Sequence, residues 1–190
     1  MIKYKIGDLI EAAKQSEINV LAHCANCYCT FGSGVAPQIK KAFPEAYAAD
    51  CETVSGDMQK LGTFTKAFNN AYTEPLMIYN LYGQGGYGKR KTGGRDLDYD
   101  AIYNALDSMK NDLLVQKDVF PDYQISIGLP CLGAGLAGGD WDIIEKMIEK
   151  TLCSANFDVT VYIRKIEEAP KSQNLSITLL TTLAQQDSLY

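Results

Sequence analysis

Apolar and polar positions along the chain predict strands that alternate with helices. Apolar-rich runs bounded by turn residues predict six strands, at 1–6, 18–23, 62–68, 76–81, 124–129 and 159–164. Helical spacing of apolar residues predicts five helices, at 9–15, 34–43, 44–52, 98–116 and 141–152. No internal repeat is visible. This alternation is typical of a layered α/β fold.

The pattern changes after residue 164. We expect residues 1–165 to form one domain and residues 166–190 to form a C-terminal extension. The stretch 171–190 is rich in Ser, Thr, Gln and Leu, a composition that fits either a docked helix or a loose tail. No chemistry is assigned to it.

Composition narrows the class of protein. The chain has 190 residues, of which 46% are hydrophobic and 22% charged, as in an ordinary globular domain. No apolar run reaches the roughly 18–20 residues of a membrane helix. The first eight residues indicate a strand and a turn rather than a signal peptide. We therefore expect a cytoplasmic protein without a membrane partner.

The net charge of −5 argues against general nucleic-acid binding, which needs a basic face. An acidic protein that binds a phosphorylated ligand needs local donors, such as backbone N–H groups. Six cysteines are expected to be reduced thiols. Three of them cluster at Cys24, Cys27 and Cys29, but no second ligand pair follows at zinc-site spacing, so no metal is expected.

Two glycine-rich segments each follow a predicted strand and open a predicted helix. Loop one (26–36) contains Gly32, Ser33, Gly34 and Val35, and loop two (133–139) contains Gly133, Ala134, Gly135, Leu136 and Ala137. Glycine lets a backbone approach a ligand closely, so two such loops at strand ends can hold a diphosphate. The alternative is that these glycines only make tight turns.

Two nucleotide-binding motifs fit these loops poorly. Neither loop has the Gly-Lys-Ser/Thr of a Walker A motif. Loop two matches G-x-G-x-x-G, but it lies late in the chain. The acid about 20 residues further on, Asp158, begins the next strand instead of ending it, which disfavours a Rossmann site.

Several segments together resemble the macro domain family, in the branch of ADP-ribose 1''-phosphate phosphatases and the terminal ADP-ribose protein glycohydrolase. The matching segments, in family order, are Gly7-Asp8-Leu9, Leu21-Ala22-His23-Cys24, Asn26, Gly32-Ser33-Gly34-Val35-Ala36, Leu129-Pro130, Gly133-Ala134-Gly135-Leu136, Asp140-Trp141 and the last strand. The resemblance implies a three-layer α/β/α fold with a mixed central sheet of about six strands. It also implies ADP-ribose or ADP-ribose 1''-phosphate as ligand, and no cofactor.

The resemblance implies roles for particular residues. Asp8, followed by Leu9, corresponds to the acid that accepts a hydrogen bond from the adenine amino group. A helix N-cap also accounts for Asp8, and the two roles are compatible. Asn26 corresponds to the asparagine that holds the distal ribose. Arg164 lies in the segment expected beside the adenine, and Gln84 in the segment after the fourth strand.

Two residues are candidates for acid–base chemistry. His23, the single histidine, ends a strand beside loop one, where it is either a general acid, an orienting group for Asn26, or a structural side chain. Asp140 precedes the helix after loop two. It is either a helix N-cap or a carboxylate that activates water near the distal ribose.

Two positions depart from the glycohydrolase of this branch. Its attacking lysine corresponds to Gln84, and its loop-two aspartate corresponds to Ala137. An amide cannot form a Schiff base with a sugar aldehyde, so that mechanism is disfavoured. The segment 83–94 carries Lys89, Arg90 and Lys91, with Arg95 just after it. It is predicted to be either a solvated loop or a lid whose cations meet phosphate.

Three functions follow from these residues. The first is hydrolysis of ADP-ribose 1''-phosphate to ADP-ribose and phosphate. The second is binding of ADP-ribose, or a related nucleotide, without turnover. The third is an ADP-ribosyl hydrolase that acts on modified macromolecules by another mechanism. The sequence does not predict an oligomeric state.

Overall fold

Six strands form one mixed sheet at the centre of the molecule. The computed structural model describes residues 1–72 and 75–165. The strand order is β1-β6-β5-β2-β4-β3, and β3 is antiparallel to β4 whereas the other neighbours are parallel. The strands are β1 (Lys3–Ile6), β2 (Val20–Asn26), β3 (Phe64–Asn69), β4 (Leu76–Gln84), β5 (Ser126–Leu129) and β6 (Asp158–Ile163).

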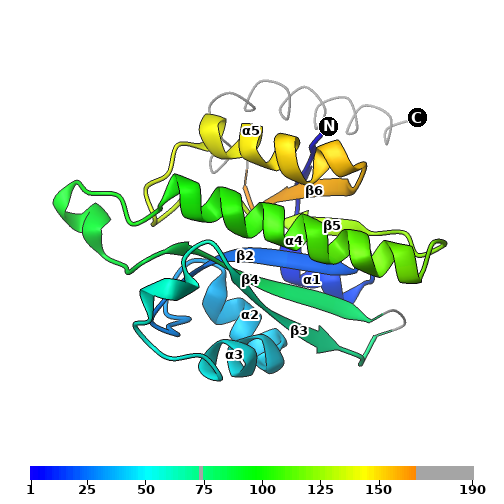
Figure 1. The fold of residues 1–190 in the computed structure, drawn as a ribbon, viewed down its shortest axis with the longest axis horizontal. Coiled ribbons are helices and arrows are strands. Elements are labelled where there is room, and N and C mark those ends of the chain that lie inside the picture. The colour runs from blue at the N-terminus through cyan, green and yellow to red at the C-terminus, as the bar shows by residue number, and fades with distance from the viewer. Residues whose placement is uncertain (73–74, 166–190) are drawn as a thin grey trace.

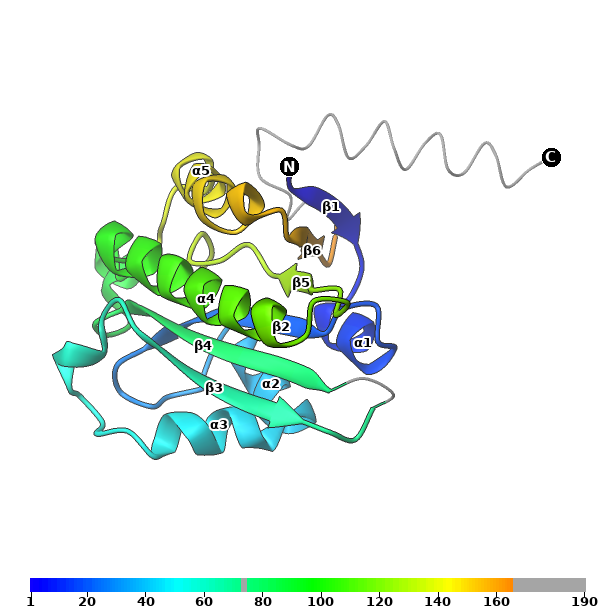
Figure 2. The same cartoon turned by 45° about the vertical axis from the view of Figure 1, so that its right-hand side comes forward.

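Helices cover both faces of this sheet. They are α1 (Leu9–Lys14), α2 (Ala36–Ala42), α3 (Pro44–Cys51), α4 (Tyr99–Val119) and α5 (Trp141–Thr151). Figures 1 and 2 show α4 and α5 on one face and α2 and α3 on the other. The predicted three-layer α/β/α architecture with a mixed sheet is thereby confirmed.

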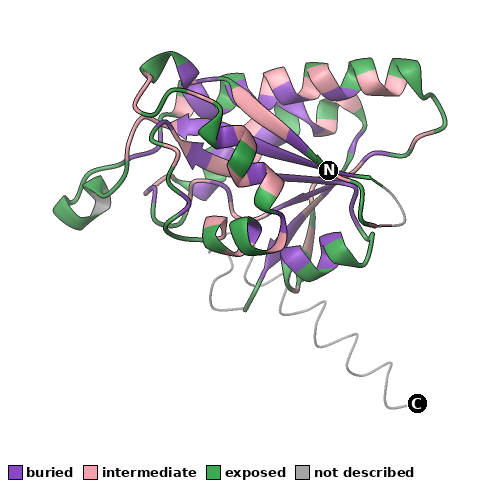
Figure 3. Ribbon diagram, turned by 90° about the horizontal axis from the view of Figure 1, so that it is seen from below, coloured by how far each residue is buried: buried purple, intermediate pink, exposed green. Residues whose placement is uncertain are grey.

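Each face of the sheet has its own hydrophobic core. One core joins the sheet to α4 and α5 through residues such as Ile102 and Ile144, and the other joins it to α1, α2 and α3 through residues such as Phe43. Successive residues of β4 alternate between them, with Tyr79 in the first core and Ile78 in the second. Figure 3 accordingly shows the central strands as largely buried.

The sheet order brings the two glycine loops together. Loop one follows β2 and loop two follows β5, and these strands are parallel neighbours. Their carboxyl ends therefore meet at one edge of the sheet, where open α/β sheets bind ligands. β2 continues to Asn26 and β4 to Gln84, beyond the predicted ends at His23 and Leu81. This extension pairs Asn26 with Gln84 at that edge.

Three short 3₁₀ turns were not predicted from the sequence: Met58–Lys60, Lys89–Thr92 and Cys153–Ala155. The second lies within the segment 83–94.

Within residues 1–72 and 75–165, no helix is long and apolar enough to cross a membrane. The same residues contain no group of three His, Cys, Asp or Glu side chains that could hold a metal. The predicted extension, 166–190, lies outside the described residues.

Candidate functional site

A cleft with two lobes runs along the carboxyl edge of the sheet. The β4 lobe, of about 500 Å³, lies over β5, β2 and β4 and is lined by His23, Asn26 and Gln84, among others. The β1 lobe, of about 770 Å³, lies over β1, β6 and β5 and is lined by Asp8 and Arg164, among others. The lobes share a wall made of Gly34, Val35, Pro130, Cys131 and Gly135.

The shared wall offers backbone donors. Among the described residues, no carbonyl or side chain accepts from the N–H groups of residues 32–35 in loop one or 135–137 in loop two. Loop two is held by other bonds, because Gly139 N–H donates to the Gly133 carbonyl at 2.9 Å. Unpaired N–H donors from two neighbouring loops can form an anion-binding surface without any side-chain charge.

The β1 lobe contains the residues predicted at one end of the ligand. The Asp8 carboxylate caps α1, and its Oδ1 accepts from Ile10 N–H at 2.8 Å and from Glu11 N–H at 3.2 Å. Both bonds end on the same oxygen, so Oδ2 is available to a ligand donor. Leu9, Ala134 and Arg164 line this lobe, together with Tyr162 and Trp141.

The β4 lobe contains Asn26, Gln84, Gly32, Ser33, Gly133, Leu136 and Ala137. The Asn26 side chain also organises loop one. Its amide nitrogen donates to the Thr30 carbonyl at 3.0 Å, and its oxygen accepts from Tyr28 N–H at 2.9 Å. A ligand at Asn26 therefore meets a side chain whose orientation the loop already fixes.

His23 is fixed as a neutral side chain at the base of the β4 lobe. Its Nε2 lies 2.7 Å from Asn80 Oδ1. The Asn80 amide nitrogen donates to Ala46 and Thr65, so Oδ1 is an acceptor and Nε2 carries the proton. Nδ1 is then a buried lone pair that has no partner among the described residues. Burial lowers the pKa of His23, which keeps the ring neutral.

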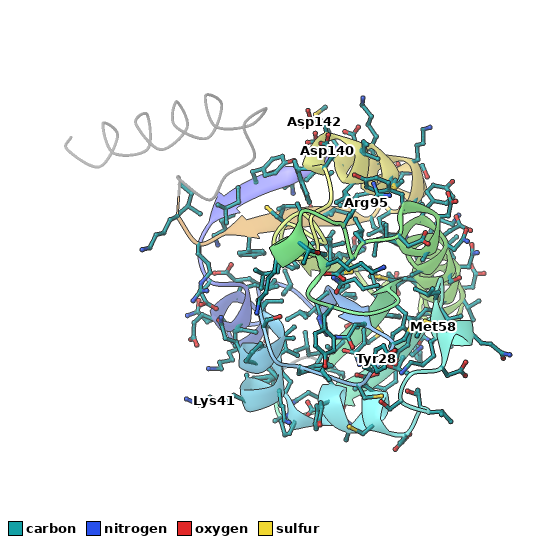
Figure 4. All side chains as sticks on the ribbon, turned by 90° about the vertical axis from the view of Figure 1, so that its left-hand side faces the viewer. Tyr28, Lys41, Met58, Arg95, Asp140 and Asp142 are labelled. Atoms are coloured by element: carbon teal, nitrogen blue, oxygen red, sulfur yellow. The ribbon has the colours of Figure 1, made fainter. Side chains whose placement is uncertain are left out.

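The structure does not bring Asp140 into either lobe. Its Oδ1 accepts from Asp142 N–H at 2.9 Å and so caps α5, and its own N–H donates to the Tyr99 hydroxyl at 2.8 Å. Figure 4 shows Asp140 beside Asp142 at the start of α5. Of the two roles predicted for Asp140, the helix N-cap is the one this arrangement supplies.

Among the cationic side chains of the basic segment that the structure describes, Lys91 is the one that lines the cleft. Lys91 lines the β4 lobe together with Tyr87. Arg95 instead stacks on the Tyr99 ring, with the guanidinium carbon 4.1 Å from the ring centre. The part of the segment around Lys91 therefore lines the lobe, where a lid would lie, whereas Arg95 lies against Tyr99 beside α4.

Asp96 is a cleft residue that the sequence analysis did not identify. It lines the β4 lobe and is only 6% exposed. The sequence places it between a basic loop and the N-cap of α4, Asp98. Nothing in that pattern separates Asp96 from Asp98 or Asp100, so its position depends on tertiary contacts.

Comparisons with known proteins agree with this architecture. The sequence profile of the macro domain family matches residues 22–148. A 17.5 kDa protein from the tk-vs intergenic region of Enterobacteria phage T4 is 35% identical over 150 residues, covering 78% of this chain and 88% of that protein.

Two further relatives span most of the chain. The ADP-ribose 1''-phosphate phosphatase of Debaryomyces hansenii is 28% identical over 180 residues, covering 86% of this chain and 99% of the yeast protein. The macrodomain of Thermus aquaticus DarG superposes with a TM-score of 0.62 at 25% identity, covering 86% of this chain and 98% of that one.

Proposed function

The chain belongs to the macro domain family, and on that premise we propose that its cleft binds ADP-ribose and ADP-ribose 1''-phosphate. The observation that carries the proposal is the shared wall, where unpaired backbone N–H groups of both glycine loops meet. A diphosphate is the ligand group that such a wall suits, because each phosphate presents several acceptor oxygens.

The two lobes then divide the ligand. The β1 lobe takes the adenosine, with Asp8 Oδ2 as the acceptor for the adenine amino group and Tyr162 and Arg164 beside the base. The β4 lobe takes the distal ribose, near Asn26 and Gln84. A ligand with two nucleoside-like ends joined by a diphosphate matches this order of lobe, wall and lobe.

We further propose that the protein hydrolyses the terminal phosphate, as the name of the Debaryomyces relative says of that protein. Water attacks the phosphorus and loses a proton, the bond from phosphorus to the sugar oxygen breaks, and that oxygen takes up a proton, so that ADP-ribose and inorganic phosphate leave. Backbone N–H groups of loop two stabilise the charge on the transferred phosphoryl oxygens. The Lys91 ammonium, on the same lobe, adds to this stabilisation.

His23 is the proposed proton acceptor for this step. Its Nδ1 has no hydrogen-bond partner within the described part of the chain, whereas Nε2–H donates to Asn80. A neutral imidazole in this tautomer can accept a proton from water but has none to give at Nδ1. The orientation of the ring is held by Asn80, whose own amide is anchored to Ala46 and Thr65.

A second candidate function is binding without turnover. Its support is the position of Asp140, which leaves Asp8 and Asp96 as the carboxylates among the described lining residues of the two lobes. Asp8 lies in the opposite lobe from the proposed reaction. A site with so few acid–base side chains is suited to bind a ligand without hydrolysing it.

The test combines calorimetry with a phosphate assay on the purified protein. We expect ADP-ribose to bind, and phosphate to be released from ADP-ribose 1''-phosphate at a rate that His23→Gln lowers. Binding with no release above a protein-free blank would leave the binding module as the function. Failure of ADP-ribose to bind would refute both candidates.

A further inference from the structure

We propose that Asp96 accepts a hydrogen bond from a hydroxyl of the distal sugar, and so makes the β4 lobe select ligands that carry this sugar. The inference rests on the proposed function, because it takes the β4 lobe as the ribose end of the cleft. It adds a specificity residue that the sequence analysis did not identify.

The two oxygens of the Asp96 carboxylate have different surroundings. Oδ2 accepts from Lys89 N–H at 3.0 Å and so holds the 3₁₀ turn of the lid. Oδ1 is buried and has no partner within the described part of the chain. A carboxylate oxygen removed from water without a donor is unfavourable, so a ligand donor that reaches it gains more than it would on the surface.

The backbone fixes Asp96 at the lobe from two sides. The N–H groups of Asp96 and Leu97 both donate to the Ala137 carbonyl of loop two, at 2.9 and 3.1 Å. Leu97 also bridges to Gln84 at the end of β4. The carboxylate is therefore carried between loop two and β4, next to residues that line the lobe.

The chemistry of the ligand determines which of its groups can donate a hydrogen bond to Asp96. At neutral pH, phosphate oxygens are acceptors with negative charge, which a carboxylate repels. Sugar hydroxyls are donors, and a charged acceptor makes a stronger hydrogen bond to them than a neutral one. Lys91 lines the same lobe, and its ammonium group attracts phosphate. Phosphate and hydroxyl groups therefore have separate partners in this lobe.

A structural role alone predicts a different outcome from a specificity role. If Asp96 only held the lid turn through Oδ2, its loss would weaken every ligand that the lid covers. Asp96→Asn separates the roles, because the amide oxygen can still accept from Lys89 N–H while an NH₂ donor replaces Oδ1. Asp100→Asn is the matched control, since Asp100 is exposed on the first turn of α4 and carries the same charge.

The experiment is calorimetry of wild type, Asp96→Asn and Asp100→Asn with ADP-ribose and with ADP, which lacks the distal sugar. We expect Asp96→Asn to weaken ADP-ribose about tenfold or more while ADP changes less than about twofold. Asp100→Asn should match wild type with both ligands.

If Asp96→Asn lowers the affinity for both ligands equally, or for neither, the inference is overturned. Asp96 would then only hold the 3₁₀ turn of the lid. Wild-type protein that binds neither ligand would instead refute the proposed function. If Asp96→Asn does not fold, Asp96→Glu is measured by the same criteria, because it keeps the charge and displaces the oxygens by one methylene. Wild type that binds ADP as tightly as ADP-ribose would also overturn the inference.

Discussion

Buried charge beneath loop one is compensated within a small cluster. Asp50 is 1% exposed, and its Oδ1 accepts from the Tyr82 hydroxyl at 2.5 Å and lies 3.7 Å from Lys60 Nζ. Burial raises the pKa of Tyr82, so its hydroxyl remains a donor. Lys60 also donates to Thr53 and to Cys29, which ties the cluster to loop one. Lys60 and Asp50 thereby compensate each other's charge in the interior.

Loss of the buried cation should be costly. Lys60→Met leaves the Asp50 carboxylate in the interior with the Tyr82 hydroxyl as its donor among the described side chains, and we expect a loss of about 3–5 kcal/mol in unfolding free energy. Lys3→Met removes an exposed pair with Asp158 and should cost at most about 1 kcal/mol. Urea denaturation of both variants measures the difference. Similar losses in the two would contradict the argument.

The single histidine should make stability depend on pH. Burial lowers the pKa of His23 in the folded state below its ordinary value of 6.5. Below pH 6.5 the histidine of the unfolded chain binds a proton, whereas His23 in the folded state stays neutral. The unfolding free energy is therefore highest above pH 6.5 and falls as the pH is lowered. We expect a loss approaching about 1.4 kcal/mol per pH unit.

Denaturation curves between about pH 6.5 and pH 5 test this, because most carboxylates titrate lower. In His23→Gln the slope in that window should disappear, whatever the variant's stability at neutral pH. An unchanged slope would mean that another group titrates there.

Asp140 gives a test of capping against catalysis. Its carboxylate accepts from Asp142 N–H, so Asp140→Ala should lower the unfolding free energy by about 1 kcal/mol, and Asp140→Ser should recover most of it. Because Asp140 lines neither lobe, we expect Asp140→Ser to release phosphate at the wild-type rate. A stable Asp140→Ser without activity would instead support the catalytic role predicted from the sequence.

At the scale of elements, the two glycine loops combine positions that need glycine for different reasons. Gly133 has a φ of +63°, and an added Cβ would lie 2.7 Å from the Leu97 side chain. Gly135 has ordinary backbone geometry, and an added Cβ would meet nothing within 4 Å. Gly135 lines both lobes, so that open space is the cleft. Gly133 is needed for the loop conformation, whereas Gly135 leaves space for the ligand.

Alanine substitutions should separate these two roles. Gly133→Ala should lower stability by about 1–2 kcal/mol for the left-handed backbone alone. Gly135→Ala should leave thermal stability unchanged and weaken ADP-ribose binding about tenfold, since a methyl group then occupies the space where the phosphates lie. Thermal melting and calorimetry on the same samples provide the comparison. Unaltered binding in Gly135→Ala would place the ligand elsewhere.

The elements themselves were largely predictable from local sequence. Asp8 and Asp140 cap α1 and α5 as expected, and six strands occur where apolar runs predicted them. The carboxyl ends of β2 and β4 were placed too early, because both strands end in a polar residue, Asn26 and Gln84, and β4 also contains the polar Asn80. Asn80 is buried there because His23, Ala46 and Thr65 satisfy its hydrogen bonds. Pairings of this kind join residues far apart in sequence and leave no local pattern.

At the scale of the whole molecule, the net charge of −5 opposes an anionic ligand. The cleft does not reverse this charge. Among its described lining residues, Lys91 and Arg164 are the cations and Asp8 and Asp96 the carboxylates, so the side chains bring equal positive and negative charge. Attraction for the diphosphate must therefore come from backbone N–H groups at short range.

Binding should consequently depend little on salt. Between about 50 and 300 mM NaCl, screening removes long-range attraction and repulsion but hardly affects hydrogen bonds within the cleft. We expect the affinity for ADP-ribose, measured by calorimetry, to change by less than about threefold over this range. A tenfold fall would show that the basic segment, not the glycine loops, supplies the attraction. Lys91→Gln would then weaken ADP-ribose binding at low salt to a similar degree. If the glycine loops supply the attraction, Lys91→Gln should change the affinity only through the contacts of Lys91 itself.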